Sequence, residues 1–197
     1  AIIIGNSCLI ILLYGLQSWV PTMLLRVYEW DLVQSGRVYG SIAMLAGSAG
    51  VLSGPFVLRY MSKINVNAPH FKLAIIGITM ATFSLVLLPF QPNVNIALVF
   101  VTMASFFVTL PLAGTSSAMV IVSPNRIRGV ITGIYVVVTS VFGLVLGPFL
   151  VASSTDFIFQ DTNAVAKSLA LVSVLVGPVG IFFMYKGINS FGEIRNV

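Results

Sequence analysis

The chain has 197 residues, of which 58% are hydrophobic and only 8% are charged, and its mean hydropathy is +1.05. This composition excludes an ordinary soluble domain, because folding in water would leave large apolar surfaces exposed. The net charge of +5 comes from basic residues scattered over many short connections, so they form no continuous patch for nucleic acid. The sequence therefore predicts a lipid bilayer as the partner and no nucleic-acid partner.

Six apolar runs follow one another along the chain, at about residues 1–25, 37–58, 72–90, 94–121, 128–153 and 165–187. Each run is long enough to cross a hydrocarbon layer about 30 Å thick as a helix. The predicted fold class is therefore an all-α membrane protein with six transmembrane helices. Because six is an even number of crossings, both termini are expected on the same side of the membrane.

Lysine and arginine are divided unequally between the two sets of connections. One set contains seven basic residues and a single acid, Glu193: Arg59, Lys63, Lys72, Arg126, Arg128, Lys186 and Arg195. The opposite set contains Arg26, Arg37 and Lys167 together with four acids, Glu29, Asp31, Asp156 and Asp161. Because cytoplasmic loops carry the excess of lysine and arginine, the first set is predicted to be cytoplasmic, with both termini inside. A plasma membrane, in bacteria the inner membrane, is the expected location.

The first run carries several polar residues on one helical face. At 100° per residue, Asn6, Tyr14, Gln17 and Pro21 fall within about 80° of one another. This face is a candidate lining of a substrate cavity, and Trp19 is a further candidate for lining the same space. Two alternatives stay open: these polar groups bond a neighbouring helix, or Trp19 anchors the outer interface.

The second run combines a glycine face with a polar face. Five glycines share an arc of about 80° at 100° per residue, namely Gly36, Gly40, Gly47, Gly50 and Gly54. Arg37 and Ser41 lie on the adjacent face and are further cavity candidates. The alternative for Arg37, which is near the outer end, is that its side chain extends to the lipid headgroups.

The fourth and fifth runs add hydroxyl groups to the candidate cavity. Thr109 lies just before Pro111, which breaks the helical hydrogen-bond ladder of the fourth run. Tyr135 and Thr139 flank a second glycine stripe, made of Gly129, Gly133, Gly143 and Gly147. The alternative for these hydroxyl groups is that they bond their own helix backbone. The third and sixth runs contain few polar groups and are expected to support the others.

An internal repeat relates the two halves of the chain. GVLSGPFVL at residues 50–58 aligns without gaps with GLVLGPFLV at residues 143–151, an offset of 93 residues. The alignment predicts repeat A at about residues 1–92, repeat B at about 93–189 and a cytoplasmic tail at 188–197. Three helices per repeat make the repeats run in opposite directions, an architecture typical of secondary transporters. The shared residues are predicted to serve helix packing or gating: Gly50, Gly54, Pro55, Gly143, Gly147 and Pro148.

Several sequence motifs resemble one protein family. They are WVPTMLLRV at residues 19–27, the glycine ladder of residues 36–54, SPNRIRG at 123–129, and Gly147-Pro148 followed by TDFIF at 155–159. Together they resemble the carboxy-terminal half of spinster-like members of the major facilitator superfamily. The resemblance implies an amino-terminal six-helix half that is missing from this chain, with substrate held between the two halves. It also implies that helices one, two, four and five line the cavity, and that the substrate is a small molecule or lipid-like, such as a lysolipid.

One motif of the family departs from its usual form. The loop after the second helix of such a half often contains G-x-x-x-D-R, whose carboxylate helps to lock the cytoplasmic side. Here Leu58 takes the acidic position, and only Arg59 of the pair is kept. A charge-based latch at this loop is therefore not expected. Arg59, Arg126 and Arg128 are the remaining candidates for a cytoplasmic-loop motif.

The predicted function is one half of a secondary active transporter that moves a small or amphiphilic organic solute by alternating access. All five acids and His70 fall in loops or at helix ends, so a proton-coupling residue is expected in the other half. The alternative is a free-standing six-helix structural or sensing subunit. An enzyme is disfavoured, because one histidine and the lone Cys8 supply no nucleophile–base pair. No metal site and no cofactor are predicted.

Overall fold

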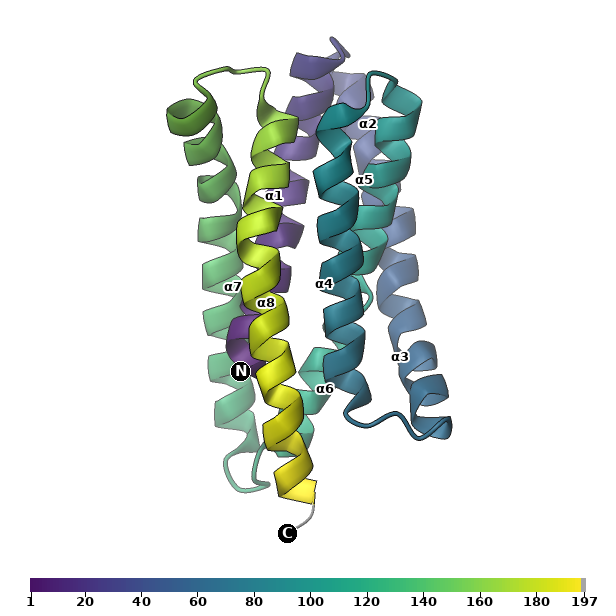
Figure 1. Ribbon diagram of the computed structural model, residues 1–197, viewed down its shortest axis with the longest axis vertical. Helices are drawn as coiled ribbons and strands as arrows, with labels where there is room; N and C mark the ends of the chain where they lie inside the picture. The colour runs from purple at the N-terminus through teal and green to yellow at the C-terminus, as the bar shows by residue number, and fades with distance from the viewer. Residues whose placement is uncertain (196–197) are drawn as a thin grey trace.

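The computed structural model describes residues 1–195 and contains six membrane-length helices, which we call spans 1 to 6 (Figure 1). Span 1 is α1 (Ile2–Val27), and span 2 joins α2 (Leu32–Ile42), the π-helical turn η1 (Ala43–Gly47) and α3 (Ser48–Lys63). Span 3 is α4 (Pro69–Leu87) with the 3₁₀ turn η2 (Leu88–Phe90). The prediction of an all-α protein with six membrane-crossing helices is confirmed for the described residues.

The second triplet also consists of three membrane-length spans. Span 4 is α5 (Val94–Thr109) followed by α6 (Leu112–Val122), and span 5 is α7 (Arg128–Ser153) followed by the π-helical turn η3 (Ser154–Phe159). Span 6 is α8 (Val165–Arg195). The predicted division near residue 92 falls between η2 and α5, and it stays a prediction.

Helix ends differ from the predicted runs where a local signal sets them. Span 2 begins five residues earlier than expected because the carboxylate of Asp31 accepts a hydrogen bond from the Val33 N–H at 3.1 Å and caps the helix. Pro69 begins α4, at a helix position where its missing N–H costs nothing. α8 continues to Arg195, so most of the predicted tail is helical, and residues 196–197 lie outside the described residues.

The two triplets of spans run in opposite directions and pack against each other. Span 2 descends in Figure 1 and α7 ascends, so the two Gly-Pro helices are antiparallel as predicted. α1 packs against α7 and α8, α4 packs against α5 and α8, and span 2 packs along span 4. Span 1 therefore has span 5 of the other triplet as its neighbour, and span 4 has span 2. The inverted arrangement of the two triplets is confirmed.

Four glycines make these cross-triplet contacts possible. A Cβ atom on Gly50 would overlap the Thr109 hydroxyl, and one on Gly54 would overlap the Leu110 carbonyl. On α7, a Cβ atom on Gly143 would overlap Ile10, and one on Gly147 would lie 2.7 Å from the Ile11 carbonyl oxygen. The backbones thus approach directly, as small residues allow in lipid. In both pairs, later residues of one helix contact later residues of the other, so the paired helices are parallel.

Four of the five remaining glycines of the predicted stripes face away from the chain. Gly36 and Gly40 of α2 and Gly129 and Gly133 of α7 have no neighbouring atom within 4 Å of a built Cβ. On α7 the reason is the alignment of the two parallel helices. Gly143 packs on Ile10, and α1 begins at Ile2, so Gly129 and Gly133 lie beyond the start of α1 and have no residue of it to contact. In span 2, the η1 turn separates Gly36 and Gly40 from the packed glycines and shifts the helical face.

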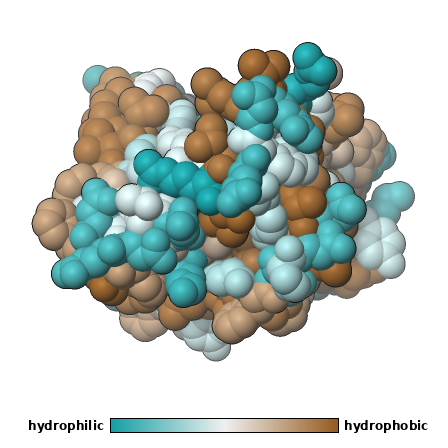
Figure 2. Space-filling model, turned by 90° about the horizontal axis from the view of Figure 1, so that it is seen from above, coloured by the Kyte–Doolittle hydropathy of each residue, from teal (hydrophilic) through white to brown (hydrophobic). Residues whose placement is uncertain are grey.

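Spans 2 and 5 are the least buried helices of the bundle. Their outward residues are large and apolar, including Met44, Leu45, Leu52 and Phe56 on span 2 and Val137, Leu144 and Phe149 on α7. Figure 2 looks onto the end that is uppermost in Figure 1, where hydrophilic residues spread across the middle and hydrophobic ones lie around the edge. This end of the bundle therefore presents polar residues, while the sides of spans 2 and 5 expose large apolar ones.

Two glycines on opposite sides of the same helix contact allow a matched test. Gly147→Ala places a methyl group 2.7 Å from the Ile11 carbonyl and 3.0 Å from the Gly15 nitrogen, whereas at Gly15 the nearest atom is an ordinary 3.6 Å away. We expect Gly147→Ala to destabilise the protein by about 1–3 kcal/mol and Gly15→Ala to be neutral or slightly stabilising. Thermal unfolding of the full-length protein in detergent measures both, and equal effects would contradict the packing described.

Candidate functional site

A groove of about 520 Å³ lies between spans 1, 2 and 4. The groove is lined by Leu13, Gln17, Ala43, Gly47, Ser48, Val51, Leu52, Thr109 and Leu112. Its polar groups are one amide and two hydroxyls, and none of these nine residues is charged. The groove is open, since the lining residue Leu52 is 68% exposed. Its volume and largely apolar lining suit an organic ligand with few polar groups.

The π-helical turn in span 2 forms one wall of the groove. η1 contributes Ala43 and Gly47 to the lining, and α3 continues it with Ser48, Val51 and Leu52. Such turns insert one extra residue into a helix and are frequent at functional sites. A Cβ atom on Gly47 would find no atom closer than 4.0 Å, where the Thr109 methyl group lies. The groove therefore lies where span 2 stands away from span 4, just before the close contact at Gly50.

The opposite wall is the break in span 4. α5 ends at Thr109 and α6 begins at Leu112, because Pro111 has no N–H to continue the ladder. Two glycines hold this break from either side. A Cβ atom on Gly54 would overlap the Leu110 carbonyl, and one on Gly77 would lie 2.7 Å from the Phe107 carbonyl and 2.9 Å from the Pro111 ring. The break is thus fixed between α3 and α4.

Of the predicted cavity residues, Gln17 and Thr109 line this groove. The Gln17 side chain is exposed, so its amide is free to meet a ligand. Thr109 is buried, and its hydroxyl lies 2.9 Å from the Ser105 carbonyl and 3.0 Å from the Phe106 carbonyl, to which it donates. The alternative for such hydroxyl groups was that they bond their own helix backbone. Thr109 does so, and it also lines the groove.

Three other candidates of span 1 make contacts between helices. Asn6 is buried and its amide oxygen accepts a 2.7 Å hydrogen bond from the Thr115 hydroxyl of α6. The indole N–H of Trp19 donates to the Pro148 carbonyl of α7 at 3.0 Å, and Tyr14 packs where α1 meets Gly147. Asn6 therefore bonds a neighbouring helix, which was the alternative for this polar face, and a substrate contact for Tyr14 or Trp19 stays a prediction. None of the three is among the residues that line the groove.

The last four candidates also lie outside the groove lining. Arg37 and Ser41 are exposed on α2, and the Ser41 hydroxyl donates to the Arg37 carbonyl at 2.8 Å. On α7 the Thr139 hydroxyl donates to the Tyr135 carbonyl at 2.8 Å. The Tyr135 hydroxyl is buried and has no hydrogen-bond partner in the described part of the chain. Whether these residues face a substrate in the complete protein stays a prediction.

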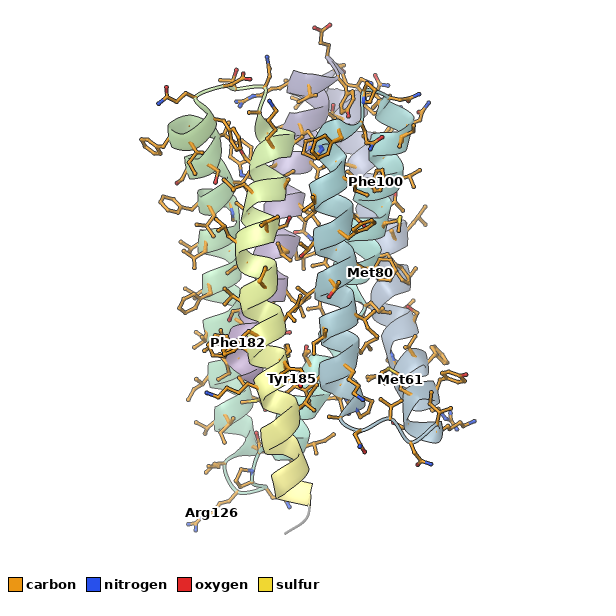
Figure 3. All side chains as sticks on the ribbon, viewed as in Figure 1. Met61, Met80, Phe100, Arg126, Phe182 and Tyr185 are labelled. Atoms are coloured by element: carbon orange, nitrogen blue, oxygen red, sulfur yellow. The ribbon has the colours of Figure 1, made fainter. Side chains whose placement is uncertain are left out.

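The connections at the end of the bundle where α8 ends carry the predicted arginines. Arg59 and Arg126 are exposed, while Arg128 is half-buried at the start of α7 (Figure 3 labels Arg126 at the end of the bundle where the carboxy terminus lies). Pro55 is also exposed. Leu58 is buried in a small apolar cluster with Leu73 of α4 and Leu110. The position that carries a carboxylate in the family motif therefore makes an apolar contact here.

Hydrogen bonds from the end of α1 and the residue that follows it link the connections at the opposite end of the bundle. The Tyr28 hydroxyl donates to the Gln91 carbonyl at 2.8 Å, and the Arg26 guanidinium donates to the Thr162 carbonyl at 3.3 Å. Burial raises the pKa of Tyr28, so its hydroxyl stays a donor over the physiological pH range. The end of α1 and the α1–α2 connection are thus bonded to the other two connections at this end of the bundle.

Most of the groove was not visible as a site in the sequence. Leu13, Ala43, Val51, Leu52 and Leu112 are apolar residues in apolar runs, and nothing in their spacing distinguishes them from lipid-facing residues. The extra residue in η1 could not be read from the sequence either. Only the small residues Gly47 and Ser48, near the Pro111 break on the facing span, hint that space is available. Among the described residues, no three His, Cys, Asp or Glu side chains lie together as metal ligands would.

The buried bond between α1 and α6 gives a quantitative prediction. Thr115→Val removes the donor to Asn6, while Asn6→Leu leaves the Thr115 hydroxyl a second acceptor, the Leu112 carbonyl at 3.1 Å. We expect Thr115→Val to cost more stability, and a double-mutant cycle to give a coupling of about 0.6 kcal/mol, and at most about 1.7. Unfolding midpoints of the four proteins in detergent supply the cycle, and strict additivity would mean that this bond is absent.

Comparison with known proteins identifies the fold. No protein-family model and none of the curated proteins matches the sequence. The structure is similar to the crystal structure of a bacterial homolog to the human lysosomal transporter Spinster, in an inward-facing and occupied conformation. The TM-score is 0.64 at 14% sequence identity, covering 95% of this chain and 46% of that one, so this chain spans about half its length. The protein therefore has the fold of about half of that transporter homolog, a bundle of six membrane-length helices.

Proposed function

We propose that this chain is half of a secondary active transporter that moves a small or amphiphilic organic solute by alternating access. The observation that carries the proposal is the open groove between spans 1, 2 and 4, in a fold that matches less than half of a larger transporter. A solute would bind in this groove and be enclosed when a second six-helix half covers it. Rocking of the two halves would then expose the solute to either side in turn.

The exposed faces of spans 2 and 5 support a partner half. Both spans present rows of large apolar side chains, and they are the helices of which the smallest share is buried. The unoccupied glycines Gly36 and Gly40 lie on span 2, and Gly129 and Gly133 lie on span 5. Small residues on an outward helix face allow close approach of another helix in lipid. The same two spans thus offer contact surfaces for helices outside this chain.

The lining supports an amphiphilic solute, as a lysolipid is. The groove offers Gln17, Ser48 and Thr109 as hydrogen-bonding groups and is otherwise apolar. A fully charged small solute would leave its charge uncompensated against such a wall, which is costly in a low dielectric. An alkyl chain with a polar head satisfies both parts of the lining. On this account the present half contributes a neutral wall, and any proton-coupling acid belongs to the other half.

The proposed location is the plasma membrane, in bacteria the inner membrane. The six apolar helices make this an integral membrane protein. The excess of lysine and arginine at the end that holds Arg59, Lys63 and Arg126 favours that end as cytoplasmic. Both termini would then be cytoplasmic.

Filling the groove should stop transport without unfolding the protein. Gly47→Phe places a ring in the groove, and the space at this Cβ leaves the helix backbone undisturbed. In vesicles that contain the full-length protein, we expect uptake of a fluorescent lysophospholipid to fall at least about tenfold, a barrier increase of about 1.4 kcal/mol. The matched control is Leu175→Phe on α8, which is exposed and remote from the groove, and which should transport normally.

Two results of this experiment would contradict the proposal. Normal uptake by a folded Gly47→Phe protein would show that solute does not pass this groove. An absence of protein-dependent flux of both lysophospholipids and small organic anions in the unaltered full-length protein would remove the transport function, and would favour a structural or sensing role for the six helices.

A further inference from the structure

The groove receives one polar side chain from each of the three spans that enclose it. Gln17 comes from α1, Ser48 from α3 and Thr109 from α5. The remaining lining residues are glycine or carry hydrocarbon side chains: Leu13, Ala43, Gly47, Val51, Leu52 and Leu112. A ligand in the groove therefore meets a single hydrogen-bonding side chain on each wall, and otherwise an apolar surface.

The directions of the spans place the polar groups together at one end of the groove. α1 rises in Figure 1, while spans 2 and 4 descend from the opposite end. In each span the polar residue lies nearer the α1–α2 connection than a leucine of the same wall, by about 4–6 Å at 1.5 Å per residue. The three pairs are Gln17 and Leu13, Ser48 and Leu52, and Thr109 and Leu112. The groove is thus amphipathic along its length.

Gln17 has the largest free hydrogen-bonding capacity of the three polar residues. Its side chain is exposed, and no hydrogen bond joins its amide to another described residue. The amide therefore offers two N–H bonds and a carbonyl oxygen. The Thr109 hydroxyl already donates to carbonyls of its own helix, so only its lone pairs are left. Ser48 is exposed and adds one hydroxyl.

The position of Gln17 within its span makes a polar ligand favourable. The residue lies about 15 Å along the helix from Val27, the end of α1, in an apolar span. An amide that faces hydrocarbon without a partner is costly at such a depth. The charged residues of the three spans all lie within about two turns of the span ends: Arg26, Arg37, Arg59 and Lys63. The lining therefore favours a head group that forms hydrogen bonds and carries no charge.

We propose that the groove binds an amphiphile in one orientation, and that Gln17 determines the specificity for its head group. The uncharged head forms hydrogen bonds with the Gln17 amide, while the hydrocarbon chain runs past Leu52 and Leu112 toward the end of the bundle where α8 ends. A glycerol monoester has this chemistry, because its hydroxyl groups donate and accept and its ester carbonyl accepts. The small residues Gly47 and Ala43 beside the polar end leave room for the head. The inference rests on the proposed function, since it takes the groove to be the solute site.

The test is photolabelling of the full-length protein in phosphatidylcholine nanodiscs. The probe is a monolaurin analogue with a diazirine at the end of its acyl chain, and the signal is labelling that excess monolaurin suppresses, mapped by peptide mass spectrometry. We expect labels near Leu52 and Leu112. Gln17→Met keeps the length of the side chain but removes the amide, and should lower this labelling at least about fivefold, as the loss of neutral hydrogen bonds implies. Gln17→Asn keeps an amide and should lose less.

Two controls separate the reading of the head group from a change in the shape of the groove. Ser18→Ala alters the exposed neighbour of Gln17, which is not a lining residue, and should change the labelling less than about twofold. A diazirine-bearing alkane of the same chain length has no head group, so it should label the groove equally in the unaltered protein and in Gln17→Met. Only variants with an unaltered unfolding midpoint are compared.

The failures of this inference differ from a failure of the proposed function. Unchanged monolaurin labelling in Gln17→Met, an equal loss with the alkane, or an equal loss in Ser18→Ala would overturn the role of Gln17. Chain-end labels near Ala43 instead of Leu52 would overturn the orientation. In all of these cases the groove remains a solute site. An absence of suppressible groove labelling in the unaltered protein would overturn the inference together with the solute site. Because the assay measures no flux, groove labelling in a protein without transport would contradict the proposed function alone.

Discussion

The structure depends on direct backbone contact between helices of different triplets. Gly50 and Gly54 bring span 2 onto span 4, while Gly143 and Gly147 bring span 5 onto span 1. In lipid, burial of apolar side chains gives little preference for one helix neighbour over another, so close packing and hydrogen bonds select the arrangement. Each glycine pair fixes one parallel helix pair. The two pairs, related by the 93-residue repeat, set the directions and neighbours of the other spans.

The same contacts determine where the groove can exist. Span 2 touches span 4 from Gly50 onward, and the groove opens just before this point, where η1 and Gly47 hold the helices apart. The Pro111 break of span 4 forms the facing wall and is itself held between Gly54 and Gly77. Close packing from Gly50 onward and separation of the helices before it are therefore parts of one arrangement, which positions Gln17 and Thr109 beside an open space.

The six helices, their inverted order and the packed glycines were predictable from the sequence. Helix length, apolarity and a repeated motif are properties of single segments, and they do not depend on which helices become neighbours. The lining was not, because helix-face arithmetic assumes an uninterrupted 100° per residue and says nothing about which face meets which helix. Asn6 and Trp19 show the consequence: both were candidates for the cavity lining, and both instead form hydrogen bonds with neighbouring helices, Asn6 with Thr115 and Trp19 with the Pro148 carbonyl. Leu58 shows the converse, an apolar contact at a position where a family motif often has a charge.

Cysteine cross-linking at the two helix contacts tests this account most directly. A Cβ atom on Gly15 would lie 3.6 Å from the Val151 side chain, and one on Gly114 would lie 3.6 Å from the Leu58 Cγ, distances within reach of a disulfide. In a full-length protein with Cys8 replaced by serine, the pairs Gly15→Cys with Val151→Cys and Leu58→Cys with Gly114→Cys should both oxidise to disulfides detectable by peptide mass spectrometry. The mixed pair Gly15→Cys with Leu58→Cys should not. A cross-link in the mixed pair, or in neither matched pair, would contradict the inverted packing from which the groove and its proposed function follow.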